Sequence, residues 1–368
     1  MLNNLNLLLK MKFHKNFQLN GVAFATSNEI IDFSNEISLE ASLFLKDWFS
    51  ENRSIEVNTS GSTGAPKTIA IKKEFFINSA LSTAEFLNLR VRTTALMCLP
   101  PNYIAGKMML VRALILGWHL DVVSPNTNPL ENSDKTYDFT AMVPLQLLNS
   151  LGKIEQIKKI IVGGGVVSPQ LQEKLQGIQS VVFATYGMTE TVTHIALKKL
   201  NHFPASAGVK SIASFYQLLP NVKAYKDTRN CLVIDAPKVS QEIIFTNDVV
   251  DLISDRHFAW LGRFDNVINS GGIKLHPEKI EEKLSKIIAQ RFFVAGISDV
   301  LLGEKLILIV ELESTNVSNF QQLFSENIKN LNTLSKYEIP KEVRFLKAFV
   351  ETETKKIQRN KTLDLIGL

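Results

Sequence analysis

The chain has 368 residues, of which 45% are hydrophobic and 21% charged, with a formal net charge of +5 and a pI near 9.0. This composition is typical of a globular protein with room for one large and one small domain. The positive charges form no basic block, which argues against a nucleic-acid partner. The modest excess of positive charge suits small anionic substrates.

Targeting and redox signals are weak in this sequence. Cys98 and Cys231 both lie in apolar settings, which favours a reducing compartment over a disulfide or thiolate-metal framework, and the histidines show no ligand spacing. Residues 1–10 lack the charged and apolar regions of a signal peptide, and no apolar run approaches the length of a membrane span. We expect a cytoplasmic protein without a membrane span. The oligomeric state is left open.

A polar loop rich in glycine and hydroxyl groups follows an expected helix at 39–49. Residues 54–58 and 68–72 alternate in polarity, so we expect two strands with a tight connection between them. Glycines in the loop let the backbone approach an anion, while amides, hydroxyls and a lysine donate. This predicts a phosphate cradle made of Thr59, Ser60, Gly61, Ser62, Thr63, Gly64 and Lys67. A solvent-exposed turn is the alternative, and the spacing is not that of a Walker A loop.

Strands and helices alternate after this loop. We expect helices at 74–89, 104–118 and 144–151, and strands at 94–99, 119–123, 139–143 and 157–162. This order predicts an α/β domain with a mostly parallel sheet covered by helices.

Two glycine-bearing turns follow strands in this region. Gly164 and Gly165 come directly after the strand 157–162, and the segment 185–191 follows a strand expected at 180–184. Since ligands collect at the carboxyl ends of strands in open α/β sheets, both turns are expected to line one crevice. For the glycines, close packing is the alternative.

The last third of the chain changes character. Residues 215–261 show short strands and turns, which predicts a β-rich subdomain. Beyond it, Pro277 opens a helix expected to run to about residue 290, followed by strands at 292–296, 305–312 and 342–349 and a helix at 318–331. We therefore expect a small α+β domain at the C-terminus.

Two motifs in this order resemble the adenylate-forming superfamily of acyl-CoA synthetases, adenylation domains and luciferases. The first is Thr-Ser-Gly-Ser-Thr-Gly-Ala-Pro-Lys at 59–67, and the second is Tyr-Gly-Met-Thr-Glu-Thr at 186–191. The resemblance implies that Tyr186 and Gly187 bind the nucleotide, with the tyrosine ring stacked on adenine. It also implies that Thr189 contacts the α-phosphate and that Glu190 holds Mg²⁺, a role consistent with a phosphate-bound hard cation.

Further motifs continue the resemblance to residue 363. Thr-Asn-Asp at 246–248 and Gly-Arg-Phe-Asp at 262–265 resemble the family's motifs that contact the ribose and the rest of the nucleotide. The resemblance implies that Asp248 and Arg263 bind ATP. The neighbouring Asp251 fits the spacing less well, and Asn247 replaces the usual glycine.

The resemblance also implies two domains, 1–264 for adenylation and 265–368 as a mobile unit, with Asp265 as the hinge. Gly271 and Gly272 are expected to contact coenzyme A. Lys356 matches the catalytic lysine, although Lys355 stands where glycine is usual and could share its work.

The function implied is ATP-dependent formation of an acyl-adenylate and then a CoA thioester, with ATP, Mg²⁺ and coenzyme A. Segments 99–109, 161–168 and 186–195 are most similar to ligases that act on o-succinylbenzoate in menaquinone biosynthesis. Another aryl- or acyl-CoA ligase and a catalytically silent nucleotide-binding protein are the alternatives. About a hundred residues that usually precede the cradle are missing.

A dianionic acid needs a matching positive or polar group in its pocket, because a buried unpaired carboxylate is costly. Thr193 and His194 follow the second motif directly, and Lys107 interrupts an apolar helix. We expect these three residues to bind the acid. The alternatives are a lysine that reaches water and a histidine packed in the core.

Overall fold

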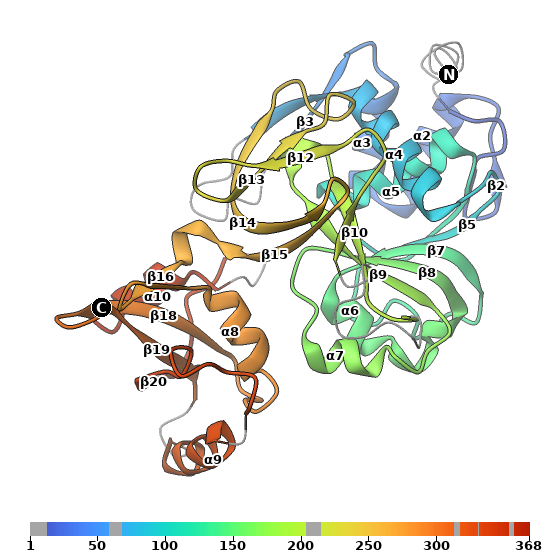
Figure 1. Ribbon diagram of the computed structural model, residues 1–368. Coiled ribbons are helices and arrows are strands. Elements are labelled where there is room, and N and C mark those ends of the chain that lie inside the picture. Colours follow the sequence, from blue (N-terminus) through green and yellow to red (C-terminus); the bar gives the residue numbers. More distant parts are fainter. Residues whose placement is uncertain (1–12, 59–67, 204–214, 313–316, 330, 353–356) are drawn as a thin grey trace.

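The fold is described from a computed structural model of the chain, covering residues 13–58, 68–203, 215–312, 317–329, 331–352 and 357–368 (Figure 1). The phosphate cradle at 59–67 and Lys355 and Lys356 lie outside the described residues. The helices are α2 (Ser27–Ile37), α3 (Leu39–Phe49), α4 (Lys73–Leu87), α5 (Ile104–Leu116), α6 (Pro144–Asn149), α7 (Pro169–Lys174), α8 (Pro277–Leu284), α9 (Val317–Lys329) and α10 (Arg359–Asp364), with 3₁₀ turns η1 (Leu151–Gln156), η2 (Thr189–Thr191) and η4 (Phe264–Asn266).

The strands belong to three sheets. They are β1 (Gln18–Leu19), β2 (Val22–Ala23), β3 (Ser54–Asn58), β4 (Thr68–Lys72), β5 (Thr94–Met97), β6 (His119–Val122), β7 (Tyr137–Met142), β8 (Ile157–Val162), β9 (Val181–Gly187), β10 (His194–Lys199), β11 (Tyr216–Leu218), β12 (Lys223–Lys226), β13 (Cys231–Asp235), β14 (Ile244–Ser254), β15 (His257–Arg263), β16 (Ile268–Ser270), β17 (Ile273–Leu275), β18 (Phe292–Asp299), β19 (Gly303–Glu311) and β20 (Glu342–Leu346).

The largest sheet changes from parallel to antiparallel pairing along its width. Its order is β12-β13-β14-β15-β11-β10-β9-β8-β7-β5-β6-β1-β2. From β9 to β1 the neighbours pair in parallel, whereas from β9 towards β12 every pairing is antiparallel. The mostly parallel α/β region and the β-rich region are both as predicted, and they meet at β9 and β10.

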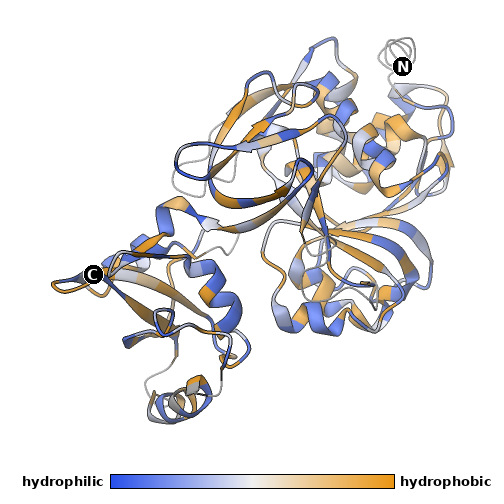
Figure 2. Cartoon of the chain, in the orientation of Figure 1, coloured by the Kyte–Doolittle hydropathy of each residue, from blue (hydrophilic) through white to orange (hydrophobic). Residues whose placement is uncertain are grey.

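Helices cover both faces of the parallel part, as period-two alternation in buried strands requires. In β5, Ala95 and Met97 pack in one core with α2 to α5, whereas Leu96 packs in a second core with α6 and α7. Figure 2 shows hydrophobic residues concentrated along these strands. The parallel strands are therefore fixed from both sides.

A separate five-stranded sheet forms the C-terminal unit, with the order β17-β16-β19-β18 and β20 beside β19. Alternate residues of β18 serve two small cores: Val294 packs with α8 and α9, and Phe293 packs with Phe349. This α+β arrangement matches the expected fold class. Figure 1 shows this unit set apart from the large sheet, with α8 on the side facing it.

Several element boundaries were predicted wrongly. The strand expected to end at residue 184 continues to Gly187, because β10 pairs with it and places Gly187 opposite His194. The helix expected to reach residue 290 ends at Leu284, where the chain turns towards β18. Helices α2 and α10 were not anticipated. Local pattern did not reveal pairing partners or short terminal helices, which depend on packing.

Candidate functional site

The polar segment 188–193 connects the last parallel strand to the first antiparallel one. It leaves the carboxyl end of β9, the edge at which ligands collect in such sheets. A Cβ atom on Gly187 would lie 2.2 Å from the carbonyl oxygen of Thr193, so only glycine fits this crossing. The hydroxyl of the buried Thr191 accepts a hydrogen bond from the Met188 amide at 3.2 Å. Hydrogen bonds within the segment therefore fix its conformation.

Val192 has φ of 65° and ψ of −57°, a backbone conformation with positive φ that a β-branched residue rarely adopts. Such strain concentrates at functional sites and is held by the surrounding structure. Just before it, Thr189 is partly exposed and Glu190 is exposed, so both side chains can reach a ligand at the strand edge.

A single carboxylate at this edge is enough for Mg²⁺ carried by a triphosphate, because that ion keeps waters and phosphate oxygens as most of its ligands. Within the described part of the chain no group of three or more metal-ligating side chains occurs. The donor set around Glu190 fits a nucleotide-borne magnesium ion and does not resemble a resident metal site.

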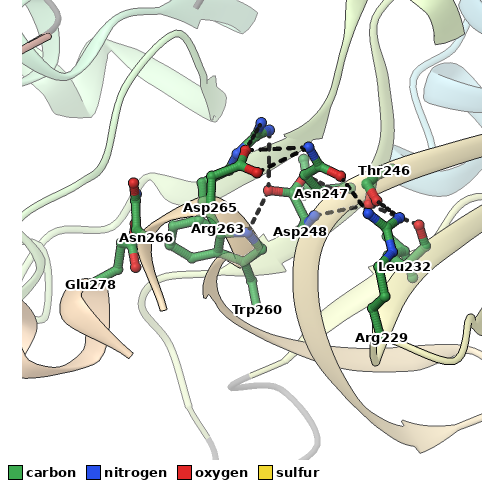
Figure 3. A network of polar contacts seen from close by, with 11 residues as sticks. Arg229, Leu232, Thr246, Asn247, Asp248, Trp260, Arg263, Asp265, Asn266 and Glu278 are labelled. Atoms are coloured by element: carbon green, nitrogen blue, oxygen red, sulfur yellow. Dashed lines mark hydrogen bonds and ion pairs between the residues drawn. The ribbon is translucent and has the colours of Figure 1, made fainter. Parts of the chain in front are cut away.

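Asp248 is the centre of a buried polar network on β14 (Figure 3). The side chain of this residue accepts a hydrogen bond from the Tyr186 hydroxyl at 2.7 Å and from Trp260 Nε1 at 3.1 Å. Arg263 Nη1 lies 3.7 Å from the same carboxylate. The backbone amide of Asp248 donates to the Thr246 hydroxyl at 3.0 Å, which fixes the main chain as well. A carboxylate has about four acceptor positions, so capacity remains for a ligand hydroxyl.

Tyr186 brings aromatic surface to this network. Its ring lies 5.7 Å from that of Tyr216 and 5.1 Å from that of Phe258, measured between centroids. Burial, followed by the charge of Asp248, raises the pKa of Tyr186 well above its usual value. The hydroxyl therefore stays protonated and donates to the carboxylate at all physiological pH values.

A second, more exposed group of polar contacts lies beside Asp248 and includes the expected hinge (Figure 3). Asn247 Nδ2 donates to Asp265 Oδ2 at 3.2 Å, and Arg263 Nη2 lies 3.3 Å from the same oxygen. On its other side Asn247 accepts a hydrogen bond from Arg229 Nη1 at 2.9 Å. The asparagine that replaces the usual glycine thus links Arg229 to Asp265.

The triple-glycine turn lies at the same sheet edge, because β8 and β9 pair in parallel with Val162 opposite Ala184. A Cβ on Gly163 would come within 2.6 Å of the Thr185 hydroxyl, so this glycine is needed for packing. Gly164 has φ of 77°, and Gly165 lies beside Pro144. The structure brings Gly164 and Gly165 to the edge that carries Thr189 and leaves their role as nucleotide contacts a prediction.

Gly271 and Gly272 form the two-residue tip of the β16–β17 hairpin. Their φ values of 60° and 80° are those of a type I′ turn, which needs positive φ at both positions. This tip belongs to the C-terminal unit and joins none of the contacts around Asp248 described above.

The structure describes the residues on either side of the phosphate cradle and of the lysine loop. Asn58 and Thr68 pair across the β3–β4 hairpin, and the Thr68 hydroxyl donates to Asn58 Oδ1 at 2.8 Å. Both ends of the cradle therefore leave a tight strand pair, as predicted. Near the C-terminus, Glu351 and Ile357 form an isolated antiparallel bridge around the loop.

Of the three residues expected to bind the acid, Thr193 and His194 are consecutive at the start of β10, whereas Lys107 has its contacts with Asn102 and Phe44. His194 is buried on the α4 side of β10, where its Nε2 lies 3.2 Å from the Thr83 hydroxyl. Burial, together with the charge of Arg112, lowers its pKa well below the usual value. Lys107 instead donates to the Asn102 carbonyl at 3.0 Å and lies near Phe44 of α3.

Sequence reasoning missed two contributors. Trp260 was not singled out in the sequence, although its indole donates to Asp248. Arg112, in the middle of the apolar helix α5, is fully buried. A cation within an apolar helix needs an explanation, and the buried Arg112 needs one more than the partly exposed Lys107 does.

The sequence is similar to a family profile and to several proteins of known activity. The sequence profile described as AMP-binding enzyme matches residues 57–226. The chain is 28% identical over 334 residues to the 2-succinylbenzoate--CoA ligase of Staphylococcus epidermidis, covering 82% of this chain and 68% of that one. It is 26% identical to the 2-succinylbenzoate--CoA ligase of Bacillus cytotoxicus, covering 84% and 69%.

Two solved structures resemble the fold of this chain. An acyl-CoA synthetase (AMP-forming)/AMP-acid ligase II-like protein from Dyadobacter fermentans is 36% identical, with a TM-score of 0.58 and coverage of 89% of this chain and 93% of that one. The o-succinylbenzoate CoA synthetase of Bacillus subtilis, in complex with its acyl-adenylate intermediate, shares the fold with a TM-score of 0.66 at 22% identity, covering 83% and 68%.

Proposed function

The chain belongs to the AMP-binding, adenylate-forming enzyme family, and from this membership we propose that it is an ATP-dependent acid:CoA ligase whose acid is o-succinylbenzoate. Such a ligase first joins the acid to AMP with release of pyrophosphate. The acyl group then passes to the thiol of coenzyme A.

The observation that carries this proposal is the buried Asp248 network. Tyr186, Trp260 and Arg263 come from two different strands and converge on one carboxylate, which is thereby fixed in position. Its remaining acceptor capacity suits ribose hydroxyls, and the Tyr186 ring suits adenine. The roles of Thr189 at the α-phosphate and Glu190 at Mg²⁺ follow from the same strand edge.

The remaining nucleotide contacts are proposed on the family motifs. Thr59 to Gly64 and Lys67 would hold the phosphates, and Lys356 would donate to the α-phosphate. Residues 1–264 would form the adenylation domain and 265–368 the mobile unit. Asp265 would be the pivot between them, and the Gly271–Gly272 turn would meet coenzyme A in the second step.

Neither step needs a protein nucleophile, since the acid carboxylate and the CoA thiol attack in turn. The protein's part is to orient the two reactants and to place positive charge and hydrogen-bond donors at the phosphate oxygens. Magnesium, when bound with ATP, neutralises phosphate charge. The exposed, single carboxylate of Glu190 is suited to hold that ion at the strand edge.

The choice of acid rests on the relatives. Those in Staphylococcus epidermidis and Bacillus cytotoxicus are both named 2-succinylbenzoate--CoA ligases and match over more than four fifths of this chain. Another aryl- or acyl-CoA ligase would share the nucleotide network but accept other acids. A catalytically silent member would bind ATP without releasing pyrophosphate.

We also propose a cytoplasmic location, supported by two buried, unpaired cysteines. Among the helices that the structure describes, none has the length and apolarity needed to cross a bilayer.

Pyrophosphate release against a panel of aromatic and aliphatic acids tests the proposal. We expect o-succinylbenzoate to give the highest kcat/KM and a product that coenzyme A converts to a thioester. Faster turnover of a medium-chain fatty acid would contradict the substrate but leave the ligase chemistry intact. The absence of pyrophosphate release with every acid would contradict the enzyme assignment.

Lys356→Ala provides the mechanistic test. Loss of one donor to developing negative charge typically lowers the rate about 10² to 10³-fold. We expect this loss in adenylation and a much smaller one in thioester formation from a supplied acyl-adenylate. Lys355→Ala is the matched control, and a larger effect from it would move the role to Lys355.

A further inference from the structure

A cationic cavity lies at the edge of the large sheet opposite the proposed nucleotide site. Lys15, Arg92 and His119 line it, together with Asn16 and Gln18. Its volume is about 340 Å³, and small-molecule pockets begin at roughly 300 Å³. Among the described residues that line the cavity, none is acidic. The cavity therefore offers positive charge and hydrogen-bonding side chains to a ligand.

The sheet topology explains why these residues meet. Gln18 begins β1, His119 begins β6, and Arg92 lies two residues before β5. The three strands run parallel, with His119 opposite both Gln18 and Thr94, so their amino ends share one edge of the sheet. Strand β2 returns antiparallel and brings Ala23, which also lines the cavity, opposite Gln18. The cavity is thus built from segments that are distant in the sequence.

This edge is separate from the proposed site of reaction. Thr189 and Glu190 follow the carboxyl end of β9, which is the opposite edge of the same sheet. Figure 1 shows β2 on the side of the large sheet away from the C-terminal unit. A molecule bound in the cavity is therefore not a reactant in position for the ligase chemistry.

Backbone hydrogen bonds hold two of the lining segments in place. The Gln18 amide donates to the Trp118 carbonyl at 3.1 Å, directly before β6. The His119 amide donates to the Thr93 carbonyl at 3.0 Å, directly before β5. Because these segments are fixed before any ligand arrives, little conformational freedom is lost on binding.

The segment that carries Lys15 is anchored in the same way. The His14 amide donates to the Leu114 carbonyl of α5 at 2.7 Å, and the Asn16 amide donates to His14 Nδ1 at 3.1 Å. Burial, followed by the charge of Lys15, lowers the pKa of His14, which keeps this nitrogen unprotonated and able to accept. Lys15 therefore lies between two anchored neighbours.

Arg92 has a backbone conformation that does not suit an arginine. Its φ is 64°, in the left-handed region that glycine and asparagine adopt most readily. The Arg92 amide donates to the Gly117 carbonyl at 2.8 Å, which holds this conformation. The side chain is exposed, so packing does not offset the backbone strain. A cation at this position is explained if its charge binds a ligand.

The cations of the cavity lack acidic partners within the described part of the chain. Acidic residues on neighbouring strands are paired elsewhere: Asp121 of β6 with Lys135, and Asp138 of β7 with Lys158, each at 2.8 Å. A guanidinium binds phosphate oxygens through two parallel hydrogen bonds, and an ammonium adds a compact charge. This set of side chains favours an anion with a phosphate group.

We propose that the cationic cavity is a binding site for a small phosphate-bearing molecule. Arg92, Lys15 and His119 hold its phosphate, and Asn16 and Gln18 contact the polar groups of its organic part. The inference is independent of the proposed ligase function. Because the ligand joins the segments that precede β1, β5 and β6, its binding stabilises the folded protein.

Calorimetric titration of the full chain tests this proposal. The probes are inorganic phosphate, glucose 6-phosphate and, as a polyanion without phosphate, citrate, all at one ionic strength because salt screens exposed charges. We expect saturable binding of glucose 6-phosphate at one site per chain, weaker binding of inorganic phosphate and no saturable binding of citrate. The Tm should rise with glucose 6-phosphate concentration.

Arg92→Asn removes the cation but keeps a residue that accepts the left-handed backbone. Its Tm without ligand should equal or exceed that of the unmodified protein, and its affinity for glucose 6-phosphate should fall about 10-fold or more, as expected for lost charge-assisted hydrogen bonds. Lys15→Gln should also weaken binding. Arg90→Asn is the matched control, since it removes the same charge from an exposed residue outside the cavity lining, and it should change the affinity less than about twofold.

Four results would overturn the inference. Equal losses in Arg92→Asn and Arg90→Asn would show an effect of net charge alone. Affinity that is unchanged in both Arg92→Asn and Lys15→Gln would place the phosphate elsewhere in the protein. Citrate binding as tight as that of glucose 6-phosphate would exclude selection for phosphate, and the absence of binding by either phosphate probe would exclude the site. Pyrophosphate release, which should be unchanged in Arg92→Asn, tests the ligase function separately.

Discussion

Two buried charged residues of this protein differ in whether the folded chain supplies partners for their charge. Asp248 is 7% exposed and holds contacts from Tyr186, Trp260 and Arg263, so its charge is matched before any ligand arrives. Arg112 is 1% exposed, and its Nε and Nη2 are without a partner among the described residues. The first arrangement is suited to a ligand that only adds hydroxyl groups. The second arrangement leaves a charge in an apolar core, which lowers the stability of the fold.

The difference has consequences for stability. A matched buried charge stabilises its surroundings only as long as every partner is present. An unmatched one lowers the stability of the protein. Removal of the two charges should therefore change stability in opposite directions.

The largest effect is expected from Asp248→Ala. The change leaves the Tyr186 hydroxyl and the Trp260 indole without their acceptor, and it removes one of the two carboxylates beside the Arg263 guanidinium. Breaking a buried charge pair in this way typically costs about 3–5 kcal/mol of unfolding free energy. Urea unfolding measures this loss, and the KM for ATP should rise as well. Asp251→Ala, at an exposed position of the same strand, is the control and should change neither quantity; similar losses in both variants would contradict the network's importance.

A smaller and pH-dependent effect is expected at Glu281, a partly buried carboxylate with a partner. Burial raises its pKa to about 7, although Arg359 Nη2 lies 2.7 Å away and lowers it. Because the folded-state pKa is above the unfolded value near 4.5, the folded protein binds more protons between these two values. Stability should therefore decrease as pH rises from about 4.5 to about 7.

Glu281→Gln should remove this contribution. The difference in unfolding free energy between the variant and the unmodified protein should change by about 1–3 kcal/mol across that pH range, since one pKa unit corresponds to about 1.4 kcal/mol. Denaturant unfolding of the full chain at a series of pH values measures it. Glu282→Gln, at the adjacent exposed position, should show no such change. A flat difference for Glu281→Gln would mean that Arg359 compensates fully for burial.

The smallest effect is expected at Asn247, whose contacts with Asp265 are long and exposed. Its amide lies 3.2 Å from Asp265 Oδ2, and exposed polar contacts contribute less than about 1 kcal/mol. If Asp265 is the pivot, Asn247→Gly should shift the ratio of adenylation to thioester-forming rates by no more than about fivefold. Asn247→Asp, which repels Asp265, should shift it further in the same direction. Stopped-flow measurement of both half-reactions decides the point, and an unchanged ratio in both variants would exclude the contact from the pivot's function.

Much of the architecture followed from the sequence because it depends on local pattern. Alternation within 54–58 and 68–72 predicted the β3–β4 pair, and Pro277 opened α8 as expected. Buried apolar strands separated by helices predicted the parallel region. The family motifs identified Tyr186 and Asp248, which the structure joins although they are far apart in the sequence.

Tertiary structure alone decided which polar residues share an environment. Lys107 and Arg112 look equivalent in the sequence, two cations in one apolar helix, yet one reaches a carbonyl oxygen and the other is sealed in the core. Similarly, the sequence at 185–187 has the composition of a turn, but pairing with β10 holds it in a strand. Local sequence sets backbone preference and polarity, whereas burial and hydrogen-bond partners come from elements distant in the chain, and those decide whether a buried charge is matched.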